Sequence, residues 1–375
     1  MLAKTPPMGW NSWNTFGGDI SETMIREMAD AMVELGYRDA GYEYLVIDDC
    51  WSELQRDDSG RLVPDRRKFP NGMKAVSDYI HSRGLKFGMY SCAGVRTCAG
   101  HPASFDHEFT DAQSFADWGV DFLKYDFCYK PERADGPLLY YRMGLALKVT
   151  GREILYSACN WGHDDAGKWI RSAGAHMYRS TGDIQDNFSS FRDIALSQIP
   201  NLCYSNTGCF NDLDMLVVGM YGKGNAALGG CSDAEYRTHF ALWCLFNSPL
   251  MIGCDLRTLN GESRRLLQNR ELIAINQDPE GRPPFLVCCT NGNRYSFFRH
   301  LADGKFAIGY FNLSDDDTDV ICSFTDLGLP AASDCGFLLR DVFTGEEWGP
   351  VREYYNPLVP AHDCKVYLAT LVKTA

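Results

Sequence analysis

The sequence predicts an α/β fold, a (β/α)8 TIM barrel followed by a C-terminal antiparallel β-sandwich domain. Strand-like apolar runs alternate with helix-like segments about eight times within about 278 residues, a count and length typical of such a barrel. After residues 277–281 (QDPEG) the pattern changes to short alternating runs separated by Gly, Asp and Asn. We therefore expect the barrel over residues 1–280 and the β domain over residues 281–375. A doubly wound sheet is the alternative for the first part.

The first half of the chain shows the alternation most clearly. Met8–Trp13 is expected to form the first strand. Apolar residues from Ile25 to Leu35 recur at helical spacing, with Ser21 as the N-cap and Gly36 as the stop. Further strands are expected at 44–47, 85–90 and 120–125, and further helices at about 72–83 and 110–118.

The second half continues the alternation and then becomes β-rich. Strands are expected at 154–158, 175–180, Met215–Val218 and 249–253. Helices are expected at about 136–150, 164–173, 188–198, 232–246 and 260–275. The β domain is expected to contain strands at 295–299, 306–312, 320–324, 336–342 and 366–371.

Composition excludes several classes of partner. A net charge of −13 disfavours nucleic acid and anionic membranes and suits a neutral ligand. No apolar run reaches the ~18 residues of a membrane helix, and the first residues show no signal core. With 15 cysteines and no signal, we expect mostly reduced thiols and a cytoplasmic protein, or a secreted one if a leader was removed. Paired C-x-x-C spacing and a phosphate-binding loop are missing, so no metal and no cofactor are expected.

Carboxylates follow three of the strand-like runs. Asp126 and Lys124 end the run 120–126, Asp48 and Asp49 follow the run 42–47, and Asp183 follows the run 175–181. Barrel strands deliver catalytic side chains at their carboxyl ends. These positions therefore predict acid–base or nucleophilic chemistry on a sugar-like substrate.

Several motifs in order resemble the α-galactosidases of glycoside hydrolase family 27. They are residues 7–13 (PMGWNSW), 48–51 (DDCW), 69–73 (FPNGM), 124–128 (KYDFC), 211–216 (NDLDML) and 275–279 (INQDP). The resemblance implies a retaining exo-α-galactosidase with two carboxyl groups about 5–5.5 Å apart. It implies that Asp126 is the nucleophile and that Asp183, four residues after Arg179, is the acid/base. Asp186 is the second candidate for the acid/base.

The same resemblance implies a set of substrate-binding residues. Asp48 and Asp49 would grip the 4- and 6-hydroxyls, and Lys124 would keep Asp126 ionised. Further expected contacts are the aromatic walls Trp13, Trp51 and Tyr90, and the rim residues Asp214 and Met215. Cys98 and Cys128 match a family disulfide pair, so they are expected to lie close in space, with their oxidation state left open.

Departures from the family pattern bear on specificity. Asn160 stands where relatives often carry glutamate, and Leu213 replaces a proline before Asp214. Trp161 is bulky, which favours an α-galactoside over an α-N-acetylgalactosaminide, and the short Asp49 leaves room for the hydroxymethyl group of galactose. The expected partner is a galactose-terminated oligosaccharide or glycan, and homo-oligomer formation is open. Alternatives are a β-L-arabinopyranosidase, an α-N-acetylgalactosaminidase and a non-catalytic galactose-binding pseudoenzyme.

Overall fold

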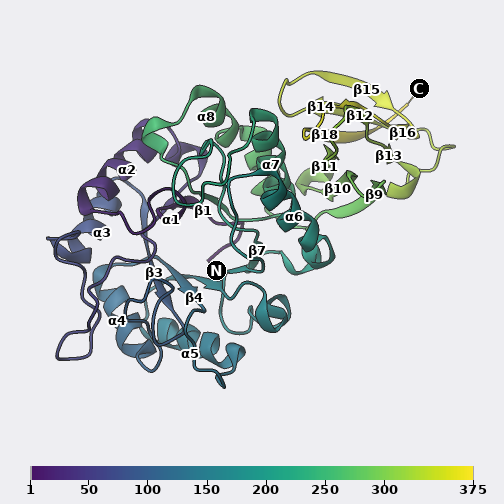
Figure 1. Ribbon diagram of the computed structural model, residues 1–375. Coiled ribbons are helices and arrows are strands. Elements are labelled where there is room, and N and C mark those ends of the chain that lie inside the picture. Colours follow the sequence, from purple (N-terminus) through teal and green to yellow (C-terminus); the bar gives the residue numbers. More distant parts are fainter. Residues whose placement is uncertain (1, 375) are drawn as a thin grey trace.

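The computed structural model describes residues 2–374 and contains a ring of parallel strands and a second, antiparallel sheet (Figure 1). The eight parallel strands run in the order β7-β6-β5-β4-β3-β2-β1-β8. Leu216 forms a parallel bridge to Ile252 and so links the two ends of this order. The strands are β1 (Met8–Asn11), β2 (Tyr44–Val46), β3 (Lys86–Cys92), β4 (Phe122–Asp126), β5 (Leu155–Cys159), β6 (Met177–Arg179), β7 (Phe210–Asp212) and β8 (Leu250–Ile252).

Helices surround this ring on its outside (Figure 1). Helix α2 shows why they form. The Ser21 side chain accepts a hydrogen bond from Met24 N at its N-terminus, and Ile25, Met28 and Met32 bury one face. The helices are α1 (Trp13–Phe16), α2 (Glu22–Glu34), α3 (Gly72–Ser82), α4 (Glu108–Trp118), α5 (Gly136–Val149), α6 (Phe188–Gln198), α7 (Asp233–Leu245), α8 (Gly261–Leu267) and α9 (Arg270–Asn276).

The C-terminal domain is built on a six-stranded antiparallel sheet in the order β15-β14-β18-β11-β10-β9. Phe298, Ile308 and Tyr367 belong to its buried core. Its strands are β9 (Phe285–Thr290), β10 (Arg294–His300), β11 (Lys305–Asn312), β14 (Cys335–Asp341), β15 (Glu347–Val351) and β18 (Cys364–Lys373). Two short pairs complete the domain, β12 (Thr318–Asp319) with β17 (Leu358–Val359) and β13 (Cys322–Ser323) with β16 (Tyr354–Tyr355).

Helix α7 joins the two domains. It lies against β11 and β18, and one buried hydrophobic cluster contains both Trp243 of α7 and Phe297 of β10. Arg237 of α7 pairs with Asp363 at 2.5 Å, and Arg299 donates to the carbonyl oxygen of Cys244 at 3.1 Å. The barrel therefore packs against the sheet through a shared hydrophobic core and through polar contacts that are buried or partly buried.

The predicted fold class is confirmed, but four predicted elements are wrong in detail. The strand placed at Met215–Val218 lies instead at Phe210–Asp212, where the polar Asn211 obscured it; Asn211 is buried and bonds to Gln198 and Ser180. Trp13 begins α1 rather than ending a strand.

The other two errors concern helices. The helix expected at 164–173 is a 3-10 segment, because Asp164 and Asp165 adopt positive φ angles of 57° and 54°. The helix expected at 260–275 is broken between α8 and α9, where the Asn269 side chain accepts from Glu271 N and Leu272 N. Among the described residues, no helix is long and apolar enough to cross a membrane.

Candidate active site

A pocket of about 590 Å³ lies at the carboxyl ends of the barrel strands. Asp126 ends β4 and Arg179 ends β6, while Trp13, Asp48 and Trp161 follow β1, β2 and β5. Most site residues predicted from the sequence line this pocket. Trp51 and Asp186 do not, and neither does Cys128, which is bonded to the lining residue Cys98. The lining residues are Trp13, Asn14, Asp48, Asp49, Tyr90, Cys98, Lys124, Asp126, Trp161, Arg179, Asp183, Ile184, Gln185, Asp214, Met215, Asn225 and Ala226.

The floor of the pocket carries a buried ion pair between Lys124 and Asp48. The Lys124 Nζ lies 2.8 Å from Asp48 Oδ2, which also accepts from Asn11 Nδ2 at 2.7 Å. Burial alone would lower the pKa of Lys124, but the neighbouring acidic groups, with Asp48 first and Asp126 among the others, together raise it above its ordinary value. Lys124 therefore stays positively charged on the same face of β4 as Asp126, two residues on.

Asp126 is buried and held through both of its oxygens. Oδ2 accepts from the Tyr90 hydroxyl at 3.0 Å, and Oδ1 accepts from its neighbour Phe127 N at 2.9 Å. Burial raises the pKa of Asp126 to about 6, Lys124 opposes that rise and Asp48 adds to it. The carboxylate is thus oriented, poorly solvated and ionised at neutral pH, as a nucleophile requires.

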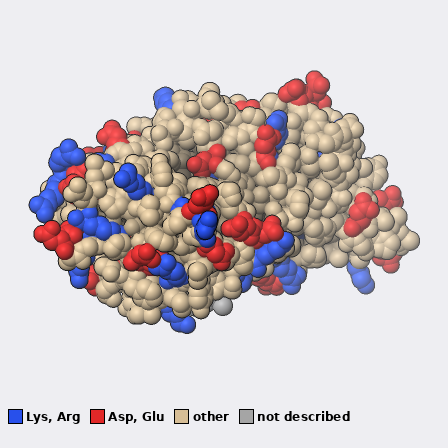
Figure 2. Space-filling view, turned by 60° about the horizontal axis from the view of Figure 1, so that its bottom comes forward, with Lys and Arg blue, Asp and Glu red and all other residues tan. Residues whose placement is uncertain are grey.

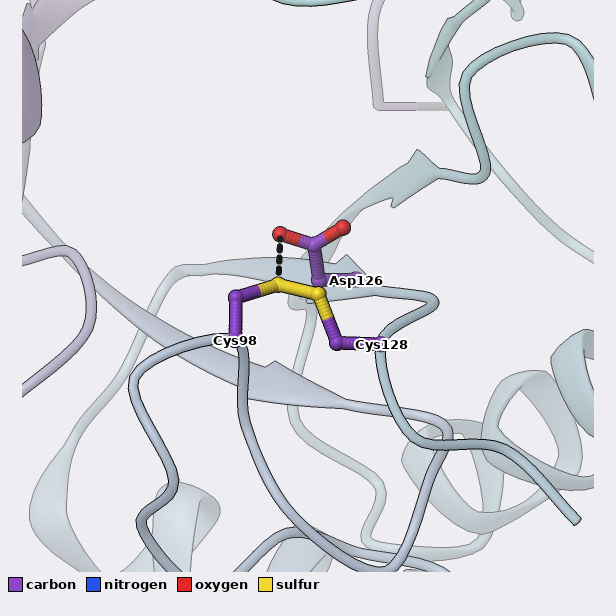
Figure 3. A group of neighbouring side chains, drawn as sticks. All are labelled: Cys98, Asp126 and Cys128. Atoms are coloured by element: carbon purple, nitrogen blue, oxygen red, sulfur yellow. Dashed lines mark hydrogen bonds between the residues drawn. A yellow bond between two sulfur atoms is a disulfide. The ribbon is translucent and has the colours of Figure 1, made fainter.

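A disulfide between Cys98 and Cys128 lies beside this carboxylate (Figure 3). It joins the loop after β3 to the loop after β4, with the two Cα atoms 5.1 Å apart. The Cys98 sulfur lies 3.4 Å from Asp126 Oδ2. Cys98, Asp126 and Cys128 also form a cluster of metal-ligating residue types, but both sulfurs are consumed by the disulfide and neither is a thiolate ligand.

Arg179 organises the opposite wall. Its Nη2 lies 3.1 Å from Asp183 Oδ1 and 2.9 Å from Asp214 Oδ2. The Asp183 side chain is 66% exposed, whereas Asp214 is buried, so Asp183 stands at the mouth of the pocket. Asp214 also accepts from Ile184 N at 2.8 Å, which ties the loop after β7 to the loop that carries Asp183.

Two further carboxylates have perturbed ionisation. Asp49 accepts from Cys50 N at 2.6 Å and Ala99 N at 2.9 Å, and burial raises its pKa. Asp212 lines a smaller cavity that shares Lys124 and Arg179 with the pocket. Burial raises the pKa of Asp212 to about 7, against the opposing effect of Arg179. Asp212 belongs to the motif at 211–216 but is not among the site residues predicted from the sequence.

Three residues considered at the sequence level serve the fold instead. Trp51 is buried outside the pocket, with its indole N–H donating to Tyr90 O at 2.8 Å. Asp186 is fully buried and accepts from Gly222 N at 2.7 Å and the Tyr236 hydroxyl at 2.9 Å, so it does not face the pocket. The Asn160 amide donates to His163 O at 2.8 Å and turns into its own loop.

Three carboxamides of the pocket were missed by sequence reasoning. Asn14, Gln185 and Asn225 come from α1, the loop after β6 and the loop before α7. Asn14 directly follows a motif residue, which is the one signal that could have pointed to it. Loop residues such as Gln185 and Asn225 have no periodicity to mark them.

Comparison with known proteins points to one family. Residues 5–278 match the family model described as alpha galactosidase A, and residues 291–369 match the alpha galactosidase C-terminal beta sandwich domain. An α-galactosidase of Cyamopsis tetragonoloba is 42% identical over 98% of this chain and 87% of its own length. The crystal structure of α-galactosidase I from Mortierella vinacea has a TM-score of 0.93 and 34% identity, covering 100% of this chain and 99% of that one. An α-galactosidase from Saccharomyces cerevisiae with raffinose has a TM-score of 0.90 and 29% identity, covering 99% and 98%.

Proposed function

The chain belongs to glycoside hydrolase family 27, and we propose that it is a retaining exo-α-galactosidase that releases terminal α-linked galactose from oligosaccharides or glycans. The observation that carries this proposal is that two of the carboxylates lining one pocket have different surroundings. Asp126 is buried at the floor beside Lys124, and Asp183 is exposed at the mouth beside Arg179. A nucleophile and an acid/base need this division of environment.

The reaction proceeds in two displacements. Asp126 attacks the anomeric carbon while Asp183 donates a proton to the departing oxygen, which leaves a galactosyl ester on Asp126. Asp183, now ionised, takes a proton from water, which attacks the same carbon and breaks the ester bond. Tyr90 and Phe127 N hold the Asp126 carboxylate in one orientation before the attack.

Three residues support galactose as the sugar. Asp48 and Asp49 offer carboxylate oxygens to the 4- and 6-hydroxyls, and the short Asp49 leaves room for the hydroxymethyl group. Trp161 lines the same pocket, and the family resemblance implies that its bulk fills the space that the acetamido group of N-acetylgalactosamine would need. Its ring packs against Phe127 and His163, with centroids 6.4 Å and 6.1 Å away, which limits its movement.

The surface also suits a neutral substrate. The face seen in Figure 2 carries acidic and basic side chains interspersed among uncharged ones rather than a basic patch. Together with the net charge of −13, this favours a neutral glycan over nucleic acid or an anionic membrane. The raffinose bound by the yeast relative is a galactose-terminated oligosaccharide of this kind.

The test compares three aryl glycosides side by side. We expect rapid release of 4-nitrophenol from the α-galactoside and little from the α-N-acetylgalactosaminide or the β-L-arabinopyranoside. Proton NMR of the first sugar released should show the α anomer, since two displacements retain configuration. Preference for either other glycoside would reject the account of Asp49 and Trp161, and no hydrolysis of any would favour a galactose-binding pseudoenzyme.

A further inference from the structure

The polar side chains of the pocket divide into two groups. The buried charged residues of the pocket are engaged with other side chains: Lys124 with Asp48, Asp126 with the Tyr90 hydroxyl, and Arg179 with Asp214. Gln185 and Asn225, by contrast, line the pocket with carboxamides that make no hydrogen bond to any residue between 2 and 374. Gln185 is half-buried and Asn225 is exposed, so both offer free donors and acceptors near the mouth.

The main chain that carries these two residues is firmly held. Asn225 N donates to Thr15 O at 3.2 Å, and Asp186 N, next to Gln185, donates to Ala226 O at 2.8 Å. The buried Asp186 carboxylate also accepts from Gly222 N, which fixes the start of the Asn225 loop to the Gln185 loop. The two carboxamides are therefore presented by cross-linked loops, so little ordering is needed when a ligand binds.

The position of Asp183 indicates which part of a substrate would contact these two carboxamides. An acid that protonates the departing oxygen stands on the side of the leaving group. Gln185 lies two residues from Asp183. Asn225 lies next to Ala226, whose carbonyl oxygen accepts a hydrogen bond from Asp186 N on the same loop as Asp183. A leaving group that departs past the exposed Asp183 therefore passes these two side chains.

The chemistry of the two residues selects the class of leaving group. A carboxamide both donates and accepts, as does a sugar hydroxyl, whereas an apolar or aryl group satisfies neither. The cations of the pocket, Lys124 and Arg179, are already paired with carboxylates, so an anionic leaving group finds no free partner there. The free groups at the mouth thus match a neutral, hydroxyl-rich leaving group.

We infer that Gln185 and Asn225 form a leaving-group subsite that recognises a neutral hexose, which rests on the proposed galactosidase function. The same subsite binds the acceptor when the galactosyl ester is transferred to a sugar. The acceptor oxygen then bonds to the anomeric carbon, its proton passes to Asp183, and the bond from that carbon to Asp126 breaks.

The test measures kcat/KM for galactosyl-α-1,6-glucose and for 4-nitrophenyl α-galactoside with each variant. Gln185→Ala and Asn225→Ala should each lower the disaccharide-to-aryl ratio roughly three- to tenfold, and the double variant by more than either. Lys223→Ala is the matched control, because Lys223 is exposed on the same loop and does not line the pocket. The ratio of transfer to hydrolysis, with glucose as acceptor and the aryl galactoside as donor, should fall in parallel.

The outcomes distinguish a failure of the subsite from a failure of the proposed function. If wild-type protein cleaves the aryl galactoside but both ratios in the Gln185 and Asn225 variants equal those of Lys223→Ala, the subsite is wrong and the proposed function stands. If the wild-type protein cleaves neither substrate, the proposed function fails and the subsite fails with it. Circular dichroism of each variant verifies that its fold is kept.

Discussion

Two buried arginines, Arg179 in the pocket and Arg299 between the domains, differ in what surrounds them. Arg179 is 4% exposed and pairs with the carboxylates of Asp183 and Asp214. Arg299 is 0% exposed and has no ion pair among the described residues; it donates to the carbonyl oxygens of Cys244 and Leu245 at 3.1 and 3.3 Å. Burial lowers the pKa of Arg299 to about 10. Burial also acts to lower the pKa of Arg179, but Asp214 and the other negative groups around it together raise that pKa above its ordinary value.

The difference distinguishes a charged residue of the candidate active site from one that stabilises the contact between the domains. Around Arg179, burial also raises the pKa values of Asp212 and Asp214, so the pocket holds charges that a stable core would not contain. Arg299 instead caps the carboxyl end of α7, where unpaired carbonyl oxygens and the helix dipole favour a cation. Changes in the pocket should therefore alter the rate, and changes at the interface should alter the stability.

The largest effect is expected from Asp126→Asn. Removing the attacking carboxylate should lower kcat on 4-nitrophenyl α-galactoside by about 10³–10⁵-fold, because no other group can form the ester. The matched change Asp186→Asn alters a buried carboxylate outside the pocket and should chiefly lower the melting temperature. Equal rates for Asp126→Asn and wild type would remove Asp126 from the mechanism.

Arg179→Met should follow in size. It removes the cation that pairs with Asp183 and Asp214, and the loss of one charge-assisted hydrogen bond and one buried ion pair corresponds to roughly 10²–10³-fold in kcat/KM. Without Arg179 the pKa of Asp212 should rise further, because that cation opposes the effect of burial. A variant with wild-type kcat/KM would show that Arg179 supports only the fold.

Arg299→Met, at the interface between the domains, should change the stability rather than the rate. The carbonyl oxygens of Cys244 and Leu245 would lose their donor, so the free energy of unfolding should fall by about 1–3 kcal/mol. The kcat of the folded protein should be unchanged, since Arg299 does not line the pocket. Urea titration with activity measured in parallel tests both statements. A rise in stability would mean that the cost of burying the charge exceeds the gain from its hydrogen bonds.

The sequence predicts those strands and site residues that a local pattern of apolar and charged residues marks. Strands such as Phe122–Asp126 are apolar and end in a charged group, so both the strand and its role could be predicted. Phe210–Asp212 was missed because its polar residues are satisfied by contacts with Ser180 and Gln198, which only the fold brings near. A local pattern does not contain such long-range partners.

The same limit applies to the site. The carboxylates Asp48, Asp126 and Asp183 could be predicted from strand ends and motifs, and the structure brings them into one pocket. Gln185 and Asn225 could not, because loop residues carry no periodicity and their approach depends on backbone bonds between distant loops. The family resemblance implied that Cys98 and Cys128 lie close, and the structure joins them in a disulfide.

The pH profile should expose the perturbed nucleophile. The pKa of Asp126 is about 6, and only the ionised form attacks, so kcat/KM should fall as the pH drops through about 6. At about pH 5 we expect roughly a tenfold loss relative to the plateau, measured with the aryl galactoside. The Arg299→Met variant should keep the same profile, which makes it the control. A plateau that extends unchanged below pH 5 would show that Lys124 outweighs burial.

The smallest effect is a gain in stability from Asp126→Asn. The pKa of Asp126 rises from about 3.9 in the unfolded chain to about 6 in the folded one, so folding favours the protonated form. Its contribution to stability is therefore complete below about pH 4 and is lost as the pH rises through about 6. Asparagine carries no charge at any pH, and Lys124 keeps Asp48 as its partner in the variant.

Asp126→Asn should accordingly be more stable than wild type at neutral pH by on the order of 1 kcal/mol, and equal to it near pH 4. Urea titrations at the two pH values measure the difference. Equal stability at both would mean that the hydrogen bonds from Tyr90 and Phe127 N compensate fully for burying the charge. A gain confined to neutral pH would show that the ionised nucleophile lowers the free energy of unfolding, whereas Arg299 raises it without taking part in catalysis.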